Sequence, residues 1–84
     1  MNIYFMHNEE NEGLYVIAVT HKSAKKIYYH CANNLNSYLD IRGHLVLKGV
    51  KEKYEDVIYF DNPKLRKYKL HYYTENGKPI PYIK

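Results

Sequence analysis

Three side chains with acid–base character stand on alternate residues near the middle of the chain: Asp40, Arg42 and His44. In an extended strand, alternate residues point to the same face and lie about 7 Å apart. A carboxylate, a guanidinium and an imidazole in one row could transfer protons or bind an anionic group. The same row is also typical of cross-strand ion pairs on a solvated sheet. The sequence leaves catalysis, binding and simple solvation all open for this face.

Five histidines and one cysteine could also do chemistry, but they are spread over separate parts of the chain. No pair has the i, i+4 spacing or the short Cys/His spacing of a zinc site. Cys31 is adjacent to His30, yet neighbouring residues of a helix point about 100° apart. Because Cys31 falls on the apolar stripe of the helix expected there, we predict a buried and inert thiol. We therefore expect no metal, no cofactor and no enzymatic activity.

Tyrosine is unusually frequent, with 11 residues in 84. Its side chain combines rigid apolar area with a hydrogen-bonding tip, and it is common at recognition surfaces. Interleaved with basic residues, tyrosine could stack on nucleic-acid bases while the basic residues bind the backbone phosphates. An AT-rich coding sequence, which favours Tyr, Lys, Asn and Ile, would explain the same composition without any function. The residues that we assign to a binding surface are Tyr29, Arg42, His44, Arg66, Lys67, Lys69, His71 and Tyr73.

Other tyrosines are expected in the core, where Tyr28, Tyr59, Tyr68 and Tyr72 fit the apolar positions of their elements. A chain of this length buries only about 60–65% of its unfolded surface, so one small core is expected. The apolar content of 45% and the charged content of 26% are ordinary for a globular protein. We therefore expect one domain over residues 1–84.

The net charge of +4 is unevenly distributed along the chain: residues 1–21 carry −3 and residues 22–84 carry +7. Such a basic part suits an anionic partner, although a solvated surface explains much of a charge of this size. The balance excludes a DNA mimic, which needs an acidic surface.

The cellular location follows from what the sequence lacks. A single cysteine cannot form an internal disulfide, and the N-terminus lacks the basic segment of a signal peptide. No apolar run approaches the roughly 20 residues of a membrane span. We expect a cytoplasmic protein that contacts no membrane, and its oligomeric state is open.

One substantial helix, Ser23–Leu35, must position many of these side chains. Its apolar residues recur at i, i+3, i+4 and i+7, which predicts a single buried stripe facing a sheet. Ser23 is the predicted N-cap, and an Asn-Asn pair suits the last turn. The stripe consists of Ala24, Ile27, Tyr28, Cys31, Ala32 and Leu35.

Strands are predicted on both sides of this helix. Asn2–His7 and Leu14–Thr20 form an N-terminal hairpin, and the second of these runs is continuously apolar, as in a central strand. We expect the helix to pack on its Val16 and Ala18 side, where small side chains allow a close approach. Ser37–Lys48 predicts a strand with one wet face. Its other face would carry Leu39, Ile41, Leu45 and Leu47.

The C-terminal part predicts shorter elements. Residues 56–60 form a short strand, and Asn62-Pro63 then starts a single helical turn over residues 64–67. Residues 68–74 alternate as a strand, and the Asn76-Gly77 turn folds residues 79–83 back onto it as an edge strand.

The order of these elements predicts an α+β fold. It is a single, mostly antiparallel β-sheet with one α-helix packed on one face, of ββαββ type with a C-terminal hairpin.

Residues 14 to about 48 resemble small uncharacterised proteins of phages and prophages. The resemblance lies in Ser23-Ala-Lys-Lys after an apolar strand and in Tyr38-Leu-Asp-Ile-Arg42 at the start of the next. It carries over no catalytic residue, but it implies a context in which small proteins often act by binding, including as inhibitors of host defence systems.

We therefore expect a non-enzymatic binding protein of a phage or other mobile element. Its basic, Tyr-rich surface would dock onto a protein or ribonucleoprotein complex, and its most concrete form is an anti-CRISPR-like inhibitor of a host defence nuclease complex. The alternative is a direct RNA-binding or single-stranded DNA-binding protein.

Overall fold

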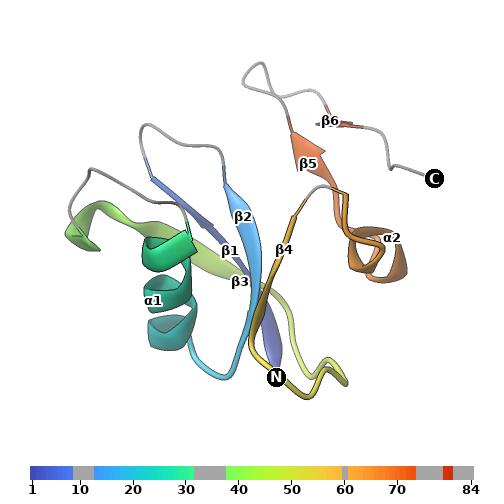
Figure 1. Cartoon of the computed structure of the whole chain (residues 1–84), viewed down its shortest axis with the longest axis horizontal. Coiled ribbons are helices and arrows are strands. Elements are labelled where there is room, and N and C mark those ends of the chain that lie inside the picture. Colours follow the sequence, from blue (N-terminus) through green and yellow to red (C-terminus); the bar gives the residue numbers. More distant parts are fainter. Residues whose placement is uncertain (9–12, 32–37, 60, 74–78, 81–84) are drawn as a thin grey trace.

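The computed structural model describes residues 1–8, 13–31, 38–59, 61–73 and 79–80. It confirms the α+β class, with strands and helices mixed along the chain (Figure 1). The elements are β1 (Asn2–His7), β2 (Leu14–Ala18), α1 (His21–Cys31), the 3₁₀ turn η1 (Tyr38–Asp40), β3 (Arg42–Leu47), β4 (Asp56–Ile58), α2 (Lys64–Lys67), β5 (Tyr72–Tyr73) and β6 (Pro79–Ile80).

Four of the strands form one antiparallel sheet in the order β3-β1-β2-β4. The predicted C-terminal pairing is confirmed, because Tyr72 lies opposite Ile80 and Tyr73 opposite Pro79. This pair forms a separate two-stranded ladder and does not extend the main sheet. The predicted Asn76-Gly77 turn lies outside the described residues.

The two central strands are buried on both faces, as the continuous apolar run in β2 predicted. Figure 1 shows α1 on one side of the sheet and α2 on the other. The α1 side contains Tyr4, Met6, Val16, Ala18, Ala24, Tyr28 and Ile41, and the α2 side contains Ile3, Tyr15, Ile17, Val50, Ile58, Leu65 and Leu70. The prediction that the helix packs on Val16 and Ala18 is therefore confirmed.

Helix α1 begins earlier than predicted. Thr20 is the N-cap, because its hydroxyl accepts a hydrogen bond from the Ser23 amide at 3.1 Å and its carbonyl accepts one from the Ala24 amide at 3.0 Å. Ser23 lies inside the first turn, so its prediction as the cap is wrong. Both residues carry a suitable hydroxyl, and the helix is capped by the one nearer to the end of β2. The end predicted at Leu35 lies outside the described residues.

The buried stripe of α1 is confirmed at Ala24 and Tyr28, whereas Ile27 is half-buried. Cys31 is exposed, so the prediction of a buried thiol is wrong. It lies in the last described turn, beside the hydroxyl of Tyr59, and this thiol is the main cause of a raised Tyr59 pKa. Tyr59 itself is 48% exposed, not a core residue as predicted.

The region predicted as one long strand with a wet face differs most from expectation. Residues 38–40 form η1, and β3 begins only at Arg42. Ile41 is buried, but Leu39 is 73% exposed. β3 lies at an edge of the sheet, where α1 lies against only part of it, so five of its six residues are exposed.

A β-bulge explains why the predicted apolar face of β3 is split. Tyr4 pairs with Leu45 while Ile3 pairs with Leu47, which leaves Val46 as the extra residue. Paired residues share a face, so Leu45 lies on the α1 side and Leu47 on the α2 side. Gly43 is required by close packing, because a Cβ atom there would lie 2.3 Å from the Sδ atom of Met6.

The helical turn predicted after Asn62-Pro63 is confirmed as α2. Pro63 has helical φ and ψ of −56° and −21°, and the Asn62 side chain accepts a 2.9 Å hydrogen bond from the Lys64 amide.

The prediction of a strand over residues 68–74 is wrong except near its end, where β5 lies. The residues up to Leu70 instead form the C-terminal cap of α2. The Leu70 amide donates to the Leu65 carbonyl at 2.7 Å, and the Lys69 amide donates to the Arg66 carbonyl at 3.1 Å. This pair of bonds is a Schellman motif. It requires a left-handed residue, which is Lys69 with φ of +57°.

Candidate binding site

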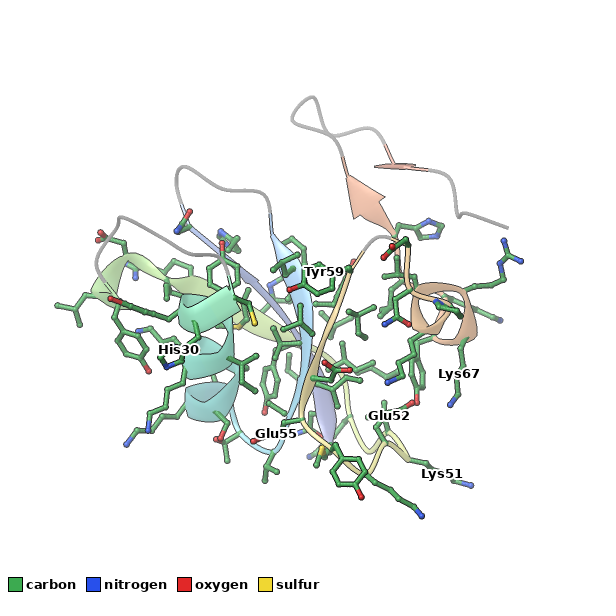
Figure 2. The ribbon with its side chains drawn as sticks, viewed as in Figure 1. His30, Lys51, Glu52, Glu55, Tyr59 and Lys67 are labelled. Atoms are coloured by element: carbon green, nitrogen blue, oxygen red, sulfur yellow. The ribbon has the colours of Figure 1, made fainter. Side chains whose placement is uncertain are left out.

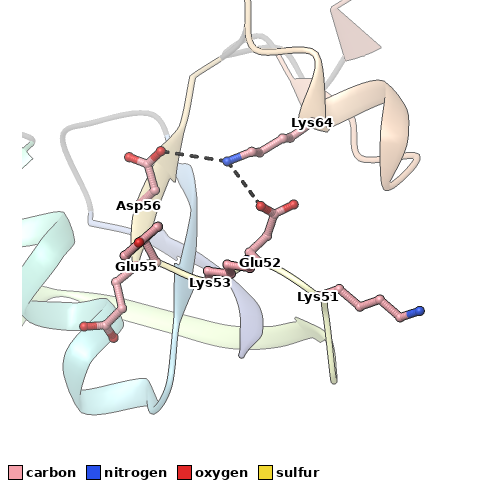
Figure 3. Close-up of a pocket in the computed structure, with 7 residues that line it drawn as sticks. Lys51, Glu52, Lys53, Glu55, Asp56 and Lys64 are labelled. Carbon is pink, nitrogen blue, oxygen red and sulfur yellow. Dashed lines mark ion pairs between the residues drawn. The ribbon is translucent and has the colours of Figure 1, made fainter.

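Glu52, in the connection between β3 and β4, organises the charged groups around α2. Its carboxylate accepts a 2.6 Å hydrogen bond from the Tyr68 hydroxyl and pairs with Lys67 at 3.3 Å and Lys64 at 3.5 Å. Lys64 also reaches Asp56 at 4.0 Å, and Figure 3 shows it between the two carboxylates. α2 is thereby tied to the connection by one carboxylate.

The pKa values in this cluster follow from the hydrogen bonds. The Tyr68 hydroxyl is the main cause of a lowered Glu52 pKa, and the two lysines lower it further. The same hydrogen bond raises the pKa of Tyr68, and the bond to Glu52 raises the pKa of Lys67. At neutral pH Glu52 is therefore ionised and its charge is compensated.

A hollow of about 310 Å³ lies at the C-terminal end of β3, and we call it the lysine hollow. Leu47, Val50 and Tyr68 supply its apolar wall, and the Lys67 ammonium lies 5.1 Å from the centroid of the Tyr68 ring. Figure 2 shows Lys51 and Lys67 on the same side of the molecule as Glu52. The full lining is Leu47, Lys48, Gly49, Val50, Lys51, Lys67 and Tyr68, so its ionisable groups are three lysines and one tyrosine.

A second hollow, of about 410 Å³, shares Lys51 with the first but has a different charge (Figure 3). Tyr54 stands in it and is 80% exposed. The lining consists of Lys51, Glu52, Lys53, Tyr54, Glu55, Asp56 and Lys64, which balances three lysines against three carboxylates. Of these two hollows in the described part of the chain, the lysine hollow is the one that combines a net positive charge with an apolar wall.

The structure brings part of the predicted binding set together. Lys67 lines the lysine hollow, and Arg66, Lys69 and His71 are exposed on α2 or just after it. The segment is fixed to the sheet because the Tyr15 hydroxyl donates a 2.7 Å hydrogen bond to the His71 carbonyl.

Two predicted tyrosines do not join this group. Tyr29 is half-buried on α1, where its ring lies 5.5 Å from that of Tyr38, so it belongs to a different element from the α2 group. The side chain of Tyr73 lies outside the described part.

The predicted row of Asp40, Arg42 and His44 is broken. Asp40 lies in η1, and Arg42 donates to the carbonyls of Leu39 at 2.7 Å and Ile41 at 3.2 Å, so its guanidinium stabilises that turn. Asp40 and Arg42 line a hollow of about 230 Å³ with His7 and Asn8. The His44 ring instead lies 5.9 Å from the ring of Phe5.

The sequence interpretation missed Lys48, Lys51 and Tyr54. Lys48 was predicted as the last residue of a strand, and Lys51 and Tyr54 fall in a polar connection that has no periodic pattern, so nothing placed them beside α2. Tyr54 gave one signal. It is an aromatic residue inside a highly charged run that has no periodic apolar face, so packing in a core does not explain it.

Within the described ranges, no group of three or more His, Cys, Asp or Glu side chains could hold a metal ion. In the same ranges, every helix is too short or too polar to cross a membrane. Comparison with protein families, curated proteins and solved structures finds no match to this chain.

Proposed function

We propose that this chain is a non-enzymatic binding protein whose lysine hollow docks onto an anionic site of a protein or ribonucleoprotein target. The observation that carries the proposal is the combination in this hollow of three lysines with an apolar wall. Glu52 pairs with Lys67 and Lys64 and accepts a hydrogen bond from Tyr68, so Lys48 and Lys51 carry the uncompensated positive charge of the hollow among the described residues.

This arrangement suits recognition of an acidic surface with an apolar centre. Lysines at the rim of an interface attract an acidic partner and speed up association. Affinity comes mainly from the desolvated centre, here Leu47, Val50 and Tyr68, with the exposed Tyr54 ring nearby as a second anchor.

In its most concrete form, the proposed target is a host defence nuclease complex and the chain is its phage-encoded inhibitor. The support for this form is the resemblance of residues 14–48 to small phage proteins.

A direct RNA or single-stranded DNA binder is the second candidate, and the lysine hollow favours it too. The rings of Tyr68 and Tyr54 could stack on bases while Lys48, Lys51 and Lys67 contact phosphates.

A pull-down from bacterial lysate, with and without nuclease treatment, tests the proposal. We compare the native chain with the double variant Lys48→Glu/Lys51→Glu and with Lys22→Glu/Lys26→Glu, a matched charge change at two exposed positions of α1. The proposal expects nuclease-resistant capture of a protein complex, which the Lys48→Glu/Lys51→Glu variant loses and the α1 variant retains. Equal capture by all three proteins would contradict it.

Salt dependence tests the nucleic-acid candidate. If the lysines contact phosphates, the logarithm of the affinity for a single-stranded oligonucleotide should fall with the logarithm of salt, with a slope of about −0.7 per phosphate. Each Lys→Ala change should then flatten the slope. Binding weaker than about 10⁻⁴ M at physiological salt, below the usual non-specific level, would remove this candidate.

A further inference from the structure

β3 is an edge strand with an accessible backbone. It pairs with β1 on one side, and no strand of the described part pairs with its other side. An edge strand presents unpaired N–H and C=O groups that can accept a further strand. A side chain approaches the strand's backbone at Gly43, whose carbonyl lies 3.3 Å from His21 Nε2.

The opposite edge, β4, is protected. It has only three residues, and the Val57 amide donates to the Asp56 carboxylate at 2.8 Å. Short edge strands and charged side chains are two devices by which proteins prevent strand addition. Of the two edges, β3 is the one open to a partner.

The apolar side chains on β3 are unusually exposed for their type: Leu45 by 46%, Val46 by 38% and Leu47 by 37%. The bulge at Val46 divides the strand into a regular part, Arg42–Leu45, and a C-terminal end. At this end, the Leu47 side chain lies on the opposite face of the sheet from Leu45. Leu47 and Lys48 at this end line the lysine hollow. The open edge and the hollow are therefore continuous.

Charge decides against a second copy of this chain as the occupant. Antiparallel self-pairing centred on Leu45 would place Arg42 opposite Lys48 at both ends, and like charges opposite each other destabilise a strand pair. The net charge of +4 on each chain adds to the repulsion. An acidic segment meets the opposite situation, because Lys48 and Lys51 line the hollow together with Lys67, whose ammonium pairs with Glu52.

We propose that the β3 edge and the lysine hollow together receive one extended, acidic segment of a partner protein. The segment pairs antiparallel with Arg42–Leu45 through its main chain. Beyond the bulge, its acidic N-terminal residues reach Lys48, Lys51 and Lys67, and an apolar side chain packs in the hollow. This inference rests on the proposed function and specifies the form of the target.

The main chain and the side chains of the bound segment would have different roles. In strand addition, main-chain hydrogen bonds supply affinity that depends little on sequence, and side-chain pockets supply specificity. Asp40, which lines a hollow together with Arg42, weakens the positive charge at the start of β3. The acidic residues of the segment should therefore gather at the hollow.

The test uses a synthetic peptide that begins with phenylalanine and a run of acidic residues and continues with alternating threonine and valine. Binding is followed by NMR of the isotope-labelled chain and by amide hydrogen exchange. We expect exchange of those Arg42–Leu45 amides that point away from β1 to slow by about tenfold on saturation, together with shifts at Lys48 and Lys51. Lys51→Glu should weaken binding by about tenfold, and Lys26→Glu should leave it unchanged.

A second peptide with the same side chains but methylated backbone nitrogens isolates the strand pairing, because it cannot donate main-chain hydrogen bonds. We expect it to bind at least about tenfold more weakly. Equal binding of both peptides, or no binding of the first at about 1 mM, would overturn the inference. The proposed function would survive either result if the pull-down still depended on Lys48 and Lys51, so the two failures are distinguishable.

Discussion

The hydroxyl of Tyr68 lies 2.6 Å from the carboxylate of Glu52, to which it donates a hydrogen bond across a separation of 16 residues. Hydrogen bonds to an ionised acceptor are shorter and stronger than neutral ones. This bond joins the end of α2 to the connection that carries Lys51, and both segments line the lysine hollow. This carboxylate therefore supports the geometry of the hollow, beside the packing of Leu65 and Leu70.

Glu52→Gln should destabilise the fold by about 1 kcal/mol, because it removes a charge-assisted bond at a partly exposed site. The pKa of Glu52 is lowered below its ordinary value of 4.5 in the folded state. Its stabilising effect is thus complete above that value and is lost as the pH falls through the lowered pKa. Chemical denaturation at several pH values checks this, because the free energy of unfolding should fall less steeply at acid pH in Glu52→Gln than in the native chain. Asp61→Asn is the control. The same steep fall in Glu52→Gln as in the native chain would contradict the prediction.

Lys69→Gly should stabilise the protein by about 1 kcal/mol, because Lys69 has φ of +57° and glycine adopts this conformation without a steric penalty. Thermal unfolding measures the change. Lys69→Ala removes the same charge but keeps the Cβ atom, so it is the matched control and should show no such gain. Equal stability of the two variants would argue against a strained Lys69.

Tyr28→Phe should leave the stability unchanged or raise it by up to about 1 kcal/mol. The side chain is fully buried, and its hydroxyl has no hydrogen-bond partner of normal geometry among the described residues. Burial raises its pKa, which the backbone amide of Asn8 opposes. Tyr28→Ala should instead cost about 3–5 kcal/mol through the cavity it leaves. A large loss in Tyr28→Phe would reveal a hydrogen bond that matters.

Gly43→Ala should destabilise the sheet by about 1–3 kcal/mol through overpacking. The new Cβ atom would lie 2.3 Å from the Sδ atom of Met6 and 2.6 Å from the Phe5 carbonyl oxygen, and the backbone oxygen cannot move freely. Gly49→Asn is the comparison, since no atom lies within 4 Å there and asparagine tolerates its φ of +72°. Urea denaturation should rank Gly43→Ala as clearly less stable, and the reverse order would refute the packing argument.

Cys31 should react with a thiol reagent in the native protein, because its side chain is exposed. We expect a rate within about tenfold of that in denaturant, where every thiol is accessible. The chain has no other cysteine, so the absorbance change reports this site alone. Strong protection of the native thiol would restore the buried position that the helical periodicity predicted.

The sequence by itself determined the elements whose signals are local. Alternating and continuous apolar runs placed β1 and β2, the helical period placed α1 on the small residues Val16 and Ala18, and Asn62-Pro63 started α2. These signals work because strand period, helix period and capping are properties of a few neighbouring residues.

Only the tertiary structure decided which faces are covered. The alternation in residues 39–47 predicted a buried face, but β3 became an edge strand, and a bulge at Val46 put Leu45 and Leu47 on opposite sides. Periodicity records that one face of an element is apolar, but a neighbouring layer determines whether that face is buried. Cys31 shows the same limit at the end of α1.

The lysine hollow likewise has no local signal, because its lining comes from residues 47–51 and residues 67–68. They meet only because α2 packs through Leu65 and Leu70 on the second face of the sheet and Glu52 holds it there. The sequence determined that lysines and tyrosines were abundant, and long-range packing decided which of them surround one apolar surface.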